Sequence, residues 1–325
     1  VVMNLKKIFQ AFPPPKFLDI PFAGLSIHDS AVRLIKFGKK DEKLFIEKYA
    51  EKALPPGAIN SGEVNNKEEL IHVLETLKKE HGLDYVKVSM PEEKAYLFAA
   101  KIPKVGDGEI KSAVESKIEE NVPVPPGELI FDYRVVDSSQ SDILHVVVSN
   151  LPISVVDKYV EIVNLAGLTP LSLEIESQAI ARALISPDST DTVLIVNFGA
   201  DKVGLYVASS RVIHFTSTIQ TKGNVAADQE FLLHEIKKLY TYWHTLKDNV
   251  DNPSKKIQEI IICGENIPDE VVSYLSTHHQ VKVLLGNVWT NAFDVNADIP
   301  TITFNDSLKY VTAVGLALPT KTLIL

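Results

Sequence analysis

Few residues in this sequence combine a reactive side chain with a spacing that supports catalysis or metal binding. The single cysteine, Cys263, directly follows two isoleucines, and this context predicts an inert buried thiol rather than a nucleophile. His278 and His279 are adjacent, whereas two histidine ligands on one helix face need a spacing of four residues, so we expect a solvated turn there. No Ser/His/Asp, Cys/His or Walker pattern is present. The motifs therefore predict neither catalytic residues nor a metal site.

The composition limits the classes of function. The chain has 325 residues, a net charge of -9 and a pI near 5.5, which argues against a nucleic-acid partner because a phosphate backbone selects for clustered basic residues. One cysteine excludes an internal disulfide framework and fits a reducing cytosol. The sequence has no apolar stretch long enough to span a bilayer, so we expect a soluble chain. Residues 3–12 form a short amphipathic segment, which fits either a helix docked on its own domain or a weak membrane-surface contact.

The elements that would position a site begin with a β-meander. Residues 24–49 alternate apolar and polar positions around a polar turn at His28-Asp29-Ser30 and a charged turn near residues 39–43. A helix over residues 67–81 is predicted by Asn66 as its N-cap and Gly82 as its end. A strand follows at residues 86–90. Strand and helix alternate, which indicates an α/β architecture.

Residues 99–168 have a different pattern and predict a small α+β domain. We expect a helix over 109–120, strands over 129–136 and 144–149, and a second helix over 154–166 that leads into a strand over 170–173. Four strands and two helices, these included, would form a small sandwich. A helix over 176–185 then returns to the first half. A polar break at residues 187–192 marks the boundary to the second half.

The second half repeats the opening pattern. Strands over 193–196, 203–207 and 212–218 form another hairpin and meander, and a long helix over 228–247 and a buried strand over 257–262 follow. A closing helix is expected over 307–318, with Gly315 permitting close approach of the backbone. The expected organisation is an N-terminal extension (1–20), a first half (21–98 and 169–187), the small domain (99–168) and a second half (188–325).

Several motifs resemble those of the actin-like ATPase superfamily and, within it, the type IV pilus assembly protein PilM family. Three turns follow apolar strands where that superfamily has its nucleotide loops: Leu25-Ser-Ile-His-Asp-Ser-Ala-Val-Arg33, Val196-Asn-Phe-Gly199 and Cys263-Gly-Glu-Asn266. The stretches more specific to the PilM family are Leu54-Pro-Pro-Gly-Ala-Ile-Asn-Ser-Gly-Glu63, Glu119-Glu-Asn-Val-Pro-Val-Pro125, Leu165-Ala-Gly-Leu-Thr-Pro170, Leu173-Glu-Ile-Glu-Ser-Gln-Ala-Ile-Ala-Arg182 and Ser307-Leu-Lys-Tyr-Val-Thr-Ala-Val-Gly-Leu-Ala317. Together they span most of the chain from residue 24 to 318.

The resemblance implies a fold and a set of partners. Two actin-like (ribonuclease H-like) halves would flank a cleft, and the small α+β domain would correspond to the extra domain shared with the division protein FtsA. PilM-like proteins act in the cytoplasm at the inner face of the membrane. There they bind the N-terminal tail of the membrane protein PilN and contact other pilus platform and motor proteins. The resemblance also implies that the groove for this tail lies between the first half and the small domain.

The sequence departs from the family at the residues expected to bind nucleotide. The equivalent positions are Ser26, His28, Asp29, Asn197, Gly199 and Gly264. Each loop normally supplies an aspartate that holds Mg²⁺, but here the first loop has Ser26 and the second has Asn197. His28 replaces a glycine and would fill space that phosphates need. Glu174 and Glu176 would lie near the cleft, where a favourable charge at a helix N-terminus is the expected role.

Another departure concerns the helical subdomain that family members place before the long helix of the second half. Only a short connection stands at residues 219–227, so we expect this subdomain to be reduced. These departures favour a non-catalytic adaptor that has lost nucleotide binding. The alternatives are a working ATPase that binds ATP and Mg²⁺ through Asp29, and an FtsA-like filament or membrane tether. The seven C-terminal residues, 319–325, are too few for the anchor helix of the last alternative.

Overall fold

The structure is a computed structural model that describes residues 20–41, 43–137, 142–221, 229–278, 281–294 and 300–319. The predicted amphipathic segment at 3–12, most of the short connection at 219–227, His279 and nearly all of the C-terminal tail lie outside these residues. Among the helices that the structure describes, none has the length and apolar content needed to cross a membrane.

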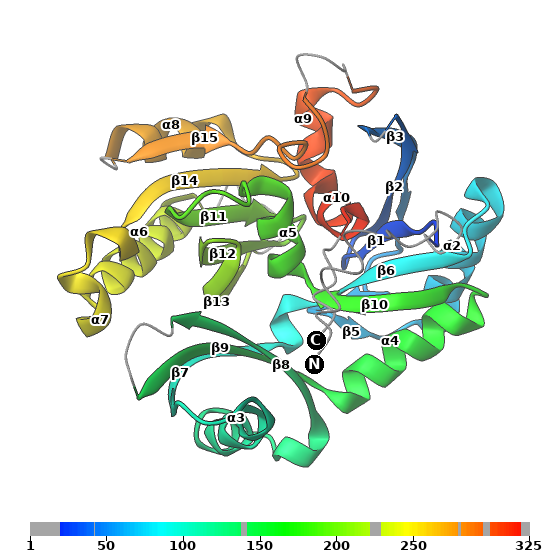
Figure 1. Cartoon of the computed structure of the whole chain (residues 1–325). Coiled ribbons are helices and arrows are strands. Elements are labelled where there is room, and N and C mark those ends of the chain that lie inside the picture. The colour runs from blue at the N-terminus through cyan, green and yellow to red at the C-terminus, as the bar shows by residue number, and fades with distance from the viewer. Residues whose placement is uncertain are drawn as a thin grey trace.

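The first half contains a five-stranded sheet in the order β10-β6-β1-β2-β3 (Figure 1). β1, β6 and β10 run parallel, and β2 and β3 extend the sheet in antiparallel pairing. Helices α2 and α4 pack against this sheet. The bounds are β1 (Ala23–Ile27), β2 (Ala31–Lys40), β3 (Lys43–Ala53), β6 (Tyr85–Met90), β10 (Thr169–Ile175), α2 (Lys67–His81) and α4 (Ile153–Leu165).

The second half repeats this arrangement strand for strand, with the order β13-β12-β11-β14-β15. β11, β14 and β15 are parallel, and β12 and β13 complete the antiparallel meander. The bounds are β11 (Thr192–Phe198), β12 (Lys202–Ser209), β13 (Val212–Gln220), β14 (Ile257–Gly264), β15 (Lys282–Leu285), α6 (Gln229–Thr245) and α8 (Asp269–His278). The duplication predicted from the repeated meander is confirmed.

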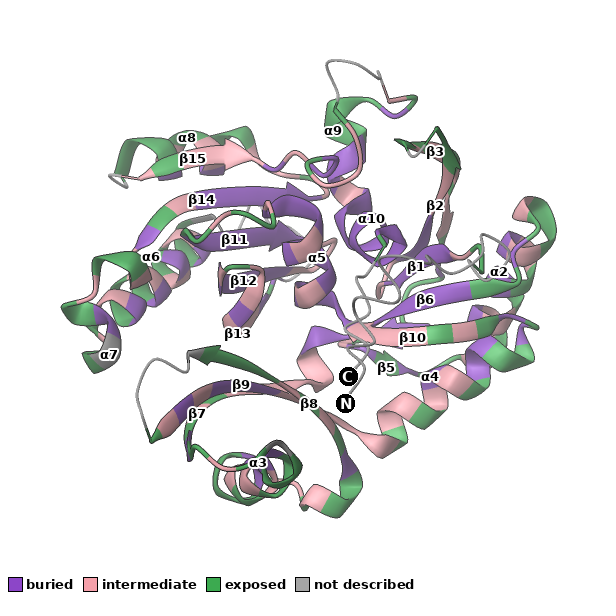
Figure 2. Cartoon of the chain, in the orientation of Figure 1, coloured by how far each residue is buried: buried purple, intermediate pink, exposed green. Residues whose placement is uncertain are grey.

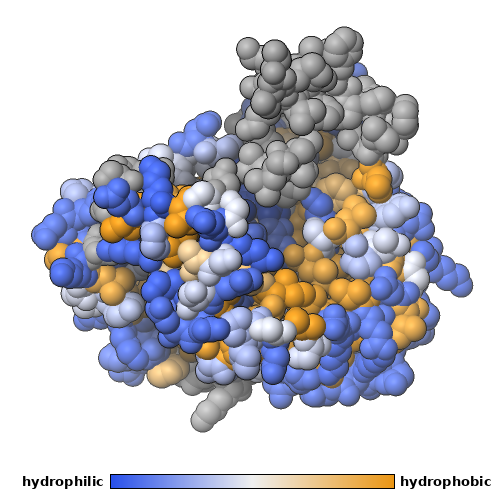
Figure 3. Space-filling model, turned by 60° about the horizontal axis from the view of Figure 1, so that its bottom comes forward, coloured by the Kyte–Doolittle hydropathy of each residue, from blue (hydrophilic) through white to orange (hydrophobic). Residues whose placement is uncertain are grey.

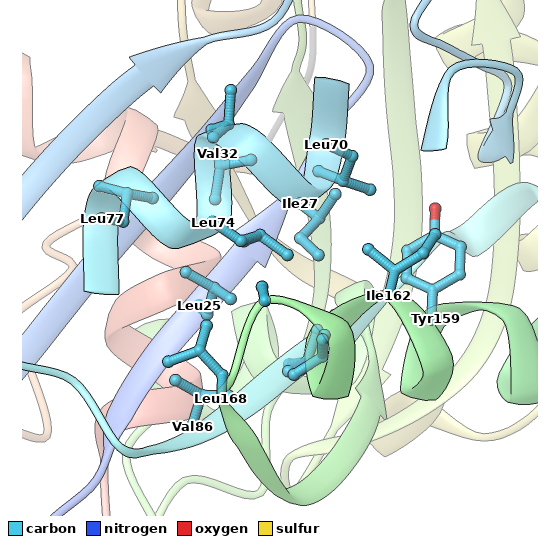
Figure 4. Close-up of a cluster of buried hydrophobic side chains, with 14 of the residues drawn as sticks. Leu25, Ile27, Val32, Leu70, Leu74, Leu77, Val86, Tyr159, Ile162 and Leu168 are labelled. Atoms are coloured by element: carbon cyan, nitrogen blue, oxygen red, sulfur yellow. The ribbon is translucent and has the colours of Figure 1, made fainter. Parts of the chain in front are cut away.

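Local sequence signals fix the position of α2. The side chain of Asn66 accepts a hydrogen bond from the Glu69 backbone N–H, and Gly82 ends the helix in the left-handed conformation. Between these caps Leu70, Leu74 and Leu77 are fully buried, and Figure 4 shows them facing strand β1 and helix α4. The predicted helix and its apolar stripe are both confirmed.

The small domain has three strands and one helix, rather than the four strands and two helices expected. Its sheet has the order β7-β9-β8, from β7 (Tyr96–Pro103), β8 (Leu129–Asp137) and β9 (Ile143–Pro152). Helix α3 (Asp107–Asn121) covers one face through Ile110, Val114 and Ile118, as predicted. The predicted strand over 170–173 is part of β10, which pairs with β6 in the first sheet, in agreement with the bounds 169–187 expected for the first half. The expected second helix is α4, whose Tyr159 and Ile162 lie in the core of the first half, so residues 153–168 pack there and not in the small domain.

Two helices lie between the sheets, α5 (Glu176–Leu184) and α10 (Val311–Ala317), and both are largely buried (Figure 2). They cross so closely that a side chain at Gly315 would lie 1.8 Å from the Ala179 carbonyl oxygen. α10 also packs on the first sheet, where a side chain at Gly24 would lie 2.1 Å from the Ala313 carbonyl oxygen. The end of the chain, which we expected to belong to the second half alone, therefore joins both halves.

The remaining described elements are short. They are β4 (Ile59–Asn60), β5 (Glu63–Val64), α7 (Lys247–Val250), α9 (Phe304–Ser307) and 3₁₀ turns at Glu92–Lys94, Pro126–Glu128, Pro253–Lys255 and Leu308–Tyr310. The turn at Glu92–Lys94 connects β6 to β7. It therefore leads the chain from the first half into the small domain.

Candidate ligand cleft between the two halves

The two β-hairpins that open the halves meet across a narrow cleft, and their turns are closed in the same way. The His28 N–H donates to the Ala31 carbonyl at 2.9 Å, and the Gly199 N–H donates to the Lys202 carbonyl at 2.8 Å. His28 is thus the structural counterpart of Gly199. The first turn therefore carries an imidazole side chain at a position where the second turn has none.

The cleft is filled by side chains and is rich in acidic groups. The remaining cavity has a volume of about 20 Å³, which is room for about one water molecule. Its charged lining comes from both halves and comprises Asp29, Glu92, Glu93, Glu176, Asp201, Glu265, Arg33, Lys202 and Lys309. Six of these are acidic and three are basic, so the cleft favours cationic groups over a polyphosphate.

Five of the six predicted site residues line this cavity: His28, Asp29, Asn197, Gly199 and Gly264. Ser26 does not. Its side chain is fully buried within β1, and its hydroxyl lies 3.5 Å from the Arg33 carbonyl oxygen. The structure therefore brings the residues of both hairpin turns together, but it leaves Ser26 beneath the surface of the cleft.

Asn197 and Glu176 meet in the centre of the site. Asn197 Nδ2 donates to Glu176 Oε1 at 3.2 Å, and the Thr312 hydroxyl donates to the same oxygen at 3.3 Å. Glu176 is the first residue of α5, as expected from its predicted place at a helix N-terminus. Its neighbour Glu174 lies outside this network and pairs with Arg182.

The His28 side chain is mostly enclosed and lies beside this carboxylate. His28 Nδ1 lies 3.5 Å from Glu176 Oε1, while the other ring nitrogen is buried and has no hydrogen-bond partner. Burial holds the pKa of His28 well below its usual value, and the nearby Arg33 and Lys202 lower it further. A neutral imidazole adds bulk to the first turn without adding positive charge for an anion.

Asp29 is engaged by the first half itself. Its two carboxylate oxygens accept hydrogen bonds from the backbone N–H groups of Ser61 at 2.8 Å and Gly62 at 3.2 Å. These N–H groups belong to the turn between β4 and β5, in the stretch that resembles the PilM family. The carboxylate thereby holds this turn against the hairpin.

Two ion pairs cross the cleft, and sequence reasoning found neither of them. Lys202 Nζ lies 2.5 Å from Glu93 Oε1 and 4.0 Å from Asp29 Oδ2. Arg33 Nη2 lies 2.5 Å from Glu265 Oε2 and 3.3 Å from Glu51 Oε1. Burial acts to lower the pKa of Lys202, but the carboxylates of Glu176, Glu93 and Asp29 outweigh it and raise this pKa.

The two glycines of the site differ in whether a residue with a side chain could replace them. Gly264 has φ +104°, and a side chain there would lie 2.0 Å from the Phe198 carbonyl oxygen, so only glycine fits. At Gly199 a side chain would be 3.2 Å from Lys202, a tight contact but one in an ordinary backbone conformation.

Cys263, beside Gly264, is fully buried, and burial raises the pKa of its thiol. The predicted inert thiol is confirmed as a buried group.

No three histidine, cysteine, aspartate or glutamate side chains in the described ranges are grouped so that they could hold a metal ion. Within the part of the chain that the structure describes, His278 stacks on Tyr274 with ring centroids 3.8 Å apart. His278 is thus engaged with its own helix.

Two sheets of identical strand order, with two hairpin turns facing across a cleft, define the class of actin-like ATPase folds. A model of the type IV pilus assembly protein PilM family matches residues 24–240. The chain therefore belongs to the PilM family of type IV pilus assembly proteins.

A solved structure agrees with this fold, and two others are more distantly similar. A structure described as a PilM-PilN type IV pilus biogenesis complex has 18% sequence identity and a TM-score of 0.75, and the match covers 92% of this chain and 98% of that one. The cytoplasmic domain of EpsL, an inner membrane component of the type II secretion system of Vibrio cholerae, has 9% identity and a TM-score of 0.47. That match covers 85% of this chain and 100% of the EpsL domain. The ethanolamine utilization protein EutJ from Carboxydothermus hydrogenoformans has 14% identity and a TM-score of 0.47. That match covers 91% of this chain and 88% of EutJ. A comparison with curated proteins gave no match.

Proposed function

We propose that this protein is a docking component of the type IV pilus assembly platform that binds the N-terminal tail of a PilN-like membrane protein at the cytoplasmic face of the inner membrane. We further propose that it does so without nucleotide. The observation that carries the first proposal is family membership over residues 24–240, together with the fold shared with the protein of the PilM-PilN complex.

Exposed apolar side chains on the small domain and on the first half support a docking role. Figure 1 places β8, α4 and β10 around the lower centre of the molecule. Three large apolar side chains on or beside these elements are exposed: Ile130 on β8, Leu165 at the end of α4 and Leu171 on β10. Figure 3, which turns this side forward, shows apolar side chains gathered near the middle of the face. Exposed apolar surface of this kind is typical of a protein interaction site.

Two strand edges are open, one in the small domain and one in the first half. Among the described strands, β8 pairs only with β9, and β10 pairs only with β6, so each has one edge without a strand neighbour. An extended peptide can add to such an edge through its backbone, while side-chain pockets supply specificity. A short N-terminal tail of a membrane protein suits this mode of binding.

Calorimetric titration with a synthetic PilN N-terminal tail tests the docking proposal. We expect binding to the wild-type protein and at least about tenfold weaker binding for Ile130→Asp and Leu171→Asp, because each places a charge in the apolar surface. Phe231→Asp is the matched control, since Phe231 is also exposed but lies on α6 in the second half. Absence of binding at high micromolar peptide, or equal weakening by the control, would contradict the proposal.

Four features support a role without nucleotide. Asn197 is neutral and bonded to Glu176, Asp29 is bonded to the backbone of another turn, the acidic residues outnumber the basic ones, and the cavity is small. A magnesium nucleotide would need carboxylates that are free to bind the metal and positively charged groups or N–H donors around the phosphates. The residues present do not fit that requirement. An active ATPase that uses Asp29 in place of the usual acid is therefore the weaker alternative.

Thermal unfolding with and without Mg-ATP tests this second proposal. We expect an unchanged Tm at millimolar Mg-ATP and no phosphate release, because a ligand that does not bind the native state cannot stabilise it. A concentration-dependent rise in Tm would refute the loss of nucleotide binding. The docking proposal would remain intact, since the titration with peptide measures it separately.

A further inference from the structure

We propose that two reciprocal ion pairs, Lys202 with Glu93 and Arg33 with Glu265, latch the cleft closed without a ligand, and that the Lys202 pair also fixes the position of the small domain. The proposal concerns the conformation of the protein alone, so it does not depend on the peptide or on the membrane partner.

The two ion pairs follow the internal duplication. Lys202 begins β12 in the hairpin of the second half and reaches across the cleft to Glu93, just beyond the end of β6. Arg33 lies on β2 in the hairpin of the first half and reaches across to Glu265, directly after β14. Because β6 and β14 are equivalent strands, each half contributes one cation from its hairpin and one carboxylate from the residues that follow its β6 or β14 strand. Opening the cleft must separate both pairs together.

Burial makes the pairs sensitive to the loss of either partner. The side chains of Arg33, Glu93 and Lys202 are 3%, 10% and 12% exposed in the closed cleft. A buried charge without its partner costs several kcal/mol, and exposure to water relieves that cost. Removal of the Lys202 charge leaves the Glu93 and Asp29 carboxylates close together in the closed cleft, without a cation to neutralise them. The open conformation then becomes the favoured one.

The position of Glu93 links the latch to the small domain. Glu93 lies in the 3₁₀ turn Glu92–Lys94, and β7, the first strand of the small domain, begins two residues after that turn at Tyr96. The preceding residue, Glu92, accepts a hydrogen bond from the Ser177 N–H at the start of α5 at 3.1 Å. On the other side of the turn, a side chain at Gly62 would lie 2.3 Å from Pro91, so the turn is packed tightly on both sides. A connection this short transmits a movement of Glu93 directly to β7.

Distance measurements between spin labels on the full chain test the proposal. The label sites are exposed positions in the three parts: Glu75→Cys on α2, Ser112→Cys on α3 and Glu270→Cys on α8, with the buried Cys263 left in place. The pair at 75 and 270 reports the cleft, and the pair at 75 and 112 reports the small domain. We compare wild type with Lys202→Met, with the charge-conserving Lys202→Arg and with Lys282→Met, which removes an exposed ion pair to Glu259.

The expected result is that Lys202→Met shifts both distance distributions, whereas Lys202→Arg and Lys282→Met leave them as in wild type. If Lys202→Met does not fold, Glu93→Gln removes the same ion pair with almost no change of shape and must give the same shifts. An unchanged distance between 75 and 270 in these variants would overturn the latch. A changed cleft with an unchanged distance between 75 and 112 would overturn the coupling to the small domain.

Discussion

Asn197 donates a hydrogen bond to Glu176 at 3.2 Å, and this contact joins the second hairpin turn to the first residue of α5. The family pattern has an aspartate at this position, and an aspartate here would place two carboxylates against each other. The neutral amide avoids this repulsion and donates to Glu176 instead.

Asn197→Asp is accordingly expected to destabilise the protein by about 3 kcal/mol at pH 8, because the new carboxylate is buried next to the Glu176 carboxylate and the amide that donated to Glu176 is lost. The loss should shrink as the pH falls, since protonation of one carboxyl of the pair restores a donor. Urea unfolding at several pH values measures both effects.

The double variant Asn197→Asp with Glu176→Gln provides the matched control. The glutamine amide can donate to the new aspartate, so most of the lost stability should return. If the double variant is as unstable as the sum of the two single variants, the contact between these residues is not the cause.

Glu92 predicts a pH dependence of stability. Burial raises the pKa of Glu92 from 4.5 to about 7 in the folded protein. Between these two values the folded state binds a proton that the unfolded state has released, so this group's contribution to stability is full below pH 4.5 and is lost as the pH rises to 7. His28 acts in the opposite direction, because its lowered pKa removes stability as the pH falls below 6.5.

Glu92→Gln removes the pH dependence that comes from Glu92 and keeps the one that comes from His28. We expect the free energy of unfolding of this variant, relative to wild type, to increase through that window and to reach a gain of about 3 kcal/mol above pH 7. Urea denaturation from pH 5 to 8 measures the difference. Parallel curves for the two proteins would show that Glu92 does not titrate in this range.

Gly264→Ala should destabilise the protein by about 3 kcal/mol or more, because the added side chain meets the Phe198 backbone and the residue must keep φ +104°. Gly57→Ala is the control: its φ is +80°, but a side chain there meets nothing within 4 Å. The control should lose only about 1 kcal/mol from backbone strain. Thermal or urea unfolding of the two variants compares these costs, and equal losses would rule out the steric contact.

Cys263 should resist thiol reagents in the native state. Its side chain is fully buried and its raised pKa keeps it protonated, whereas the thiolate is the reactive form. We expect colourimetric labelling with a disulfide reagent to follow unfolding in urea, with one thiol reacting per denatured chain. Rapid labelling of the folded protein would contradict the buried environment.

The periodic elements were predictable because their signals are local. Asn66, Gly82 and the leucines between them specify α2 within one stretch of chain, and the repeated meander revealed the duplicated halves. The assignment of α4 to the small domain failed for the complementary reason. A helix after β9 and a strand after it carry the same pattern whether they pack on the small sheet or on the first sheet, and only contacts such as those of Tyr159 decide between them.

The sequence by itself determined the architecture, the family and the absence of an aspartate at Ser26 and Asn197, since strand and helix periodicity and residue identity are properties of the chain. The tertiary structure alone decided that Asp29 binds a neighbouring turn and that Lys202 meets Glu93, which is 109 residues away in the chain. The physical reason is that the strength of an ion pair depends on the distance between the charges and on their burial in the folded protein. Neither quantity can be derived from the spacing of the residues along the chain.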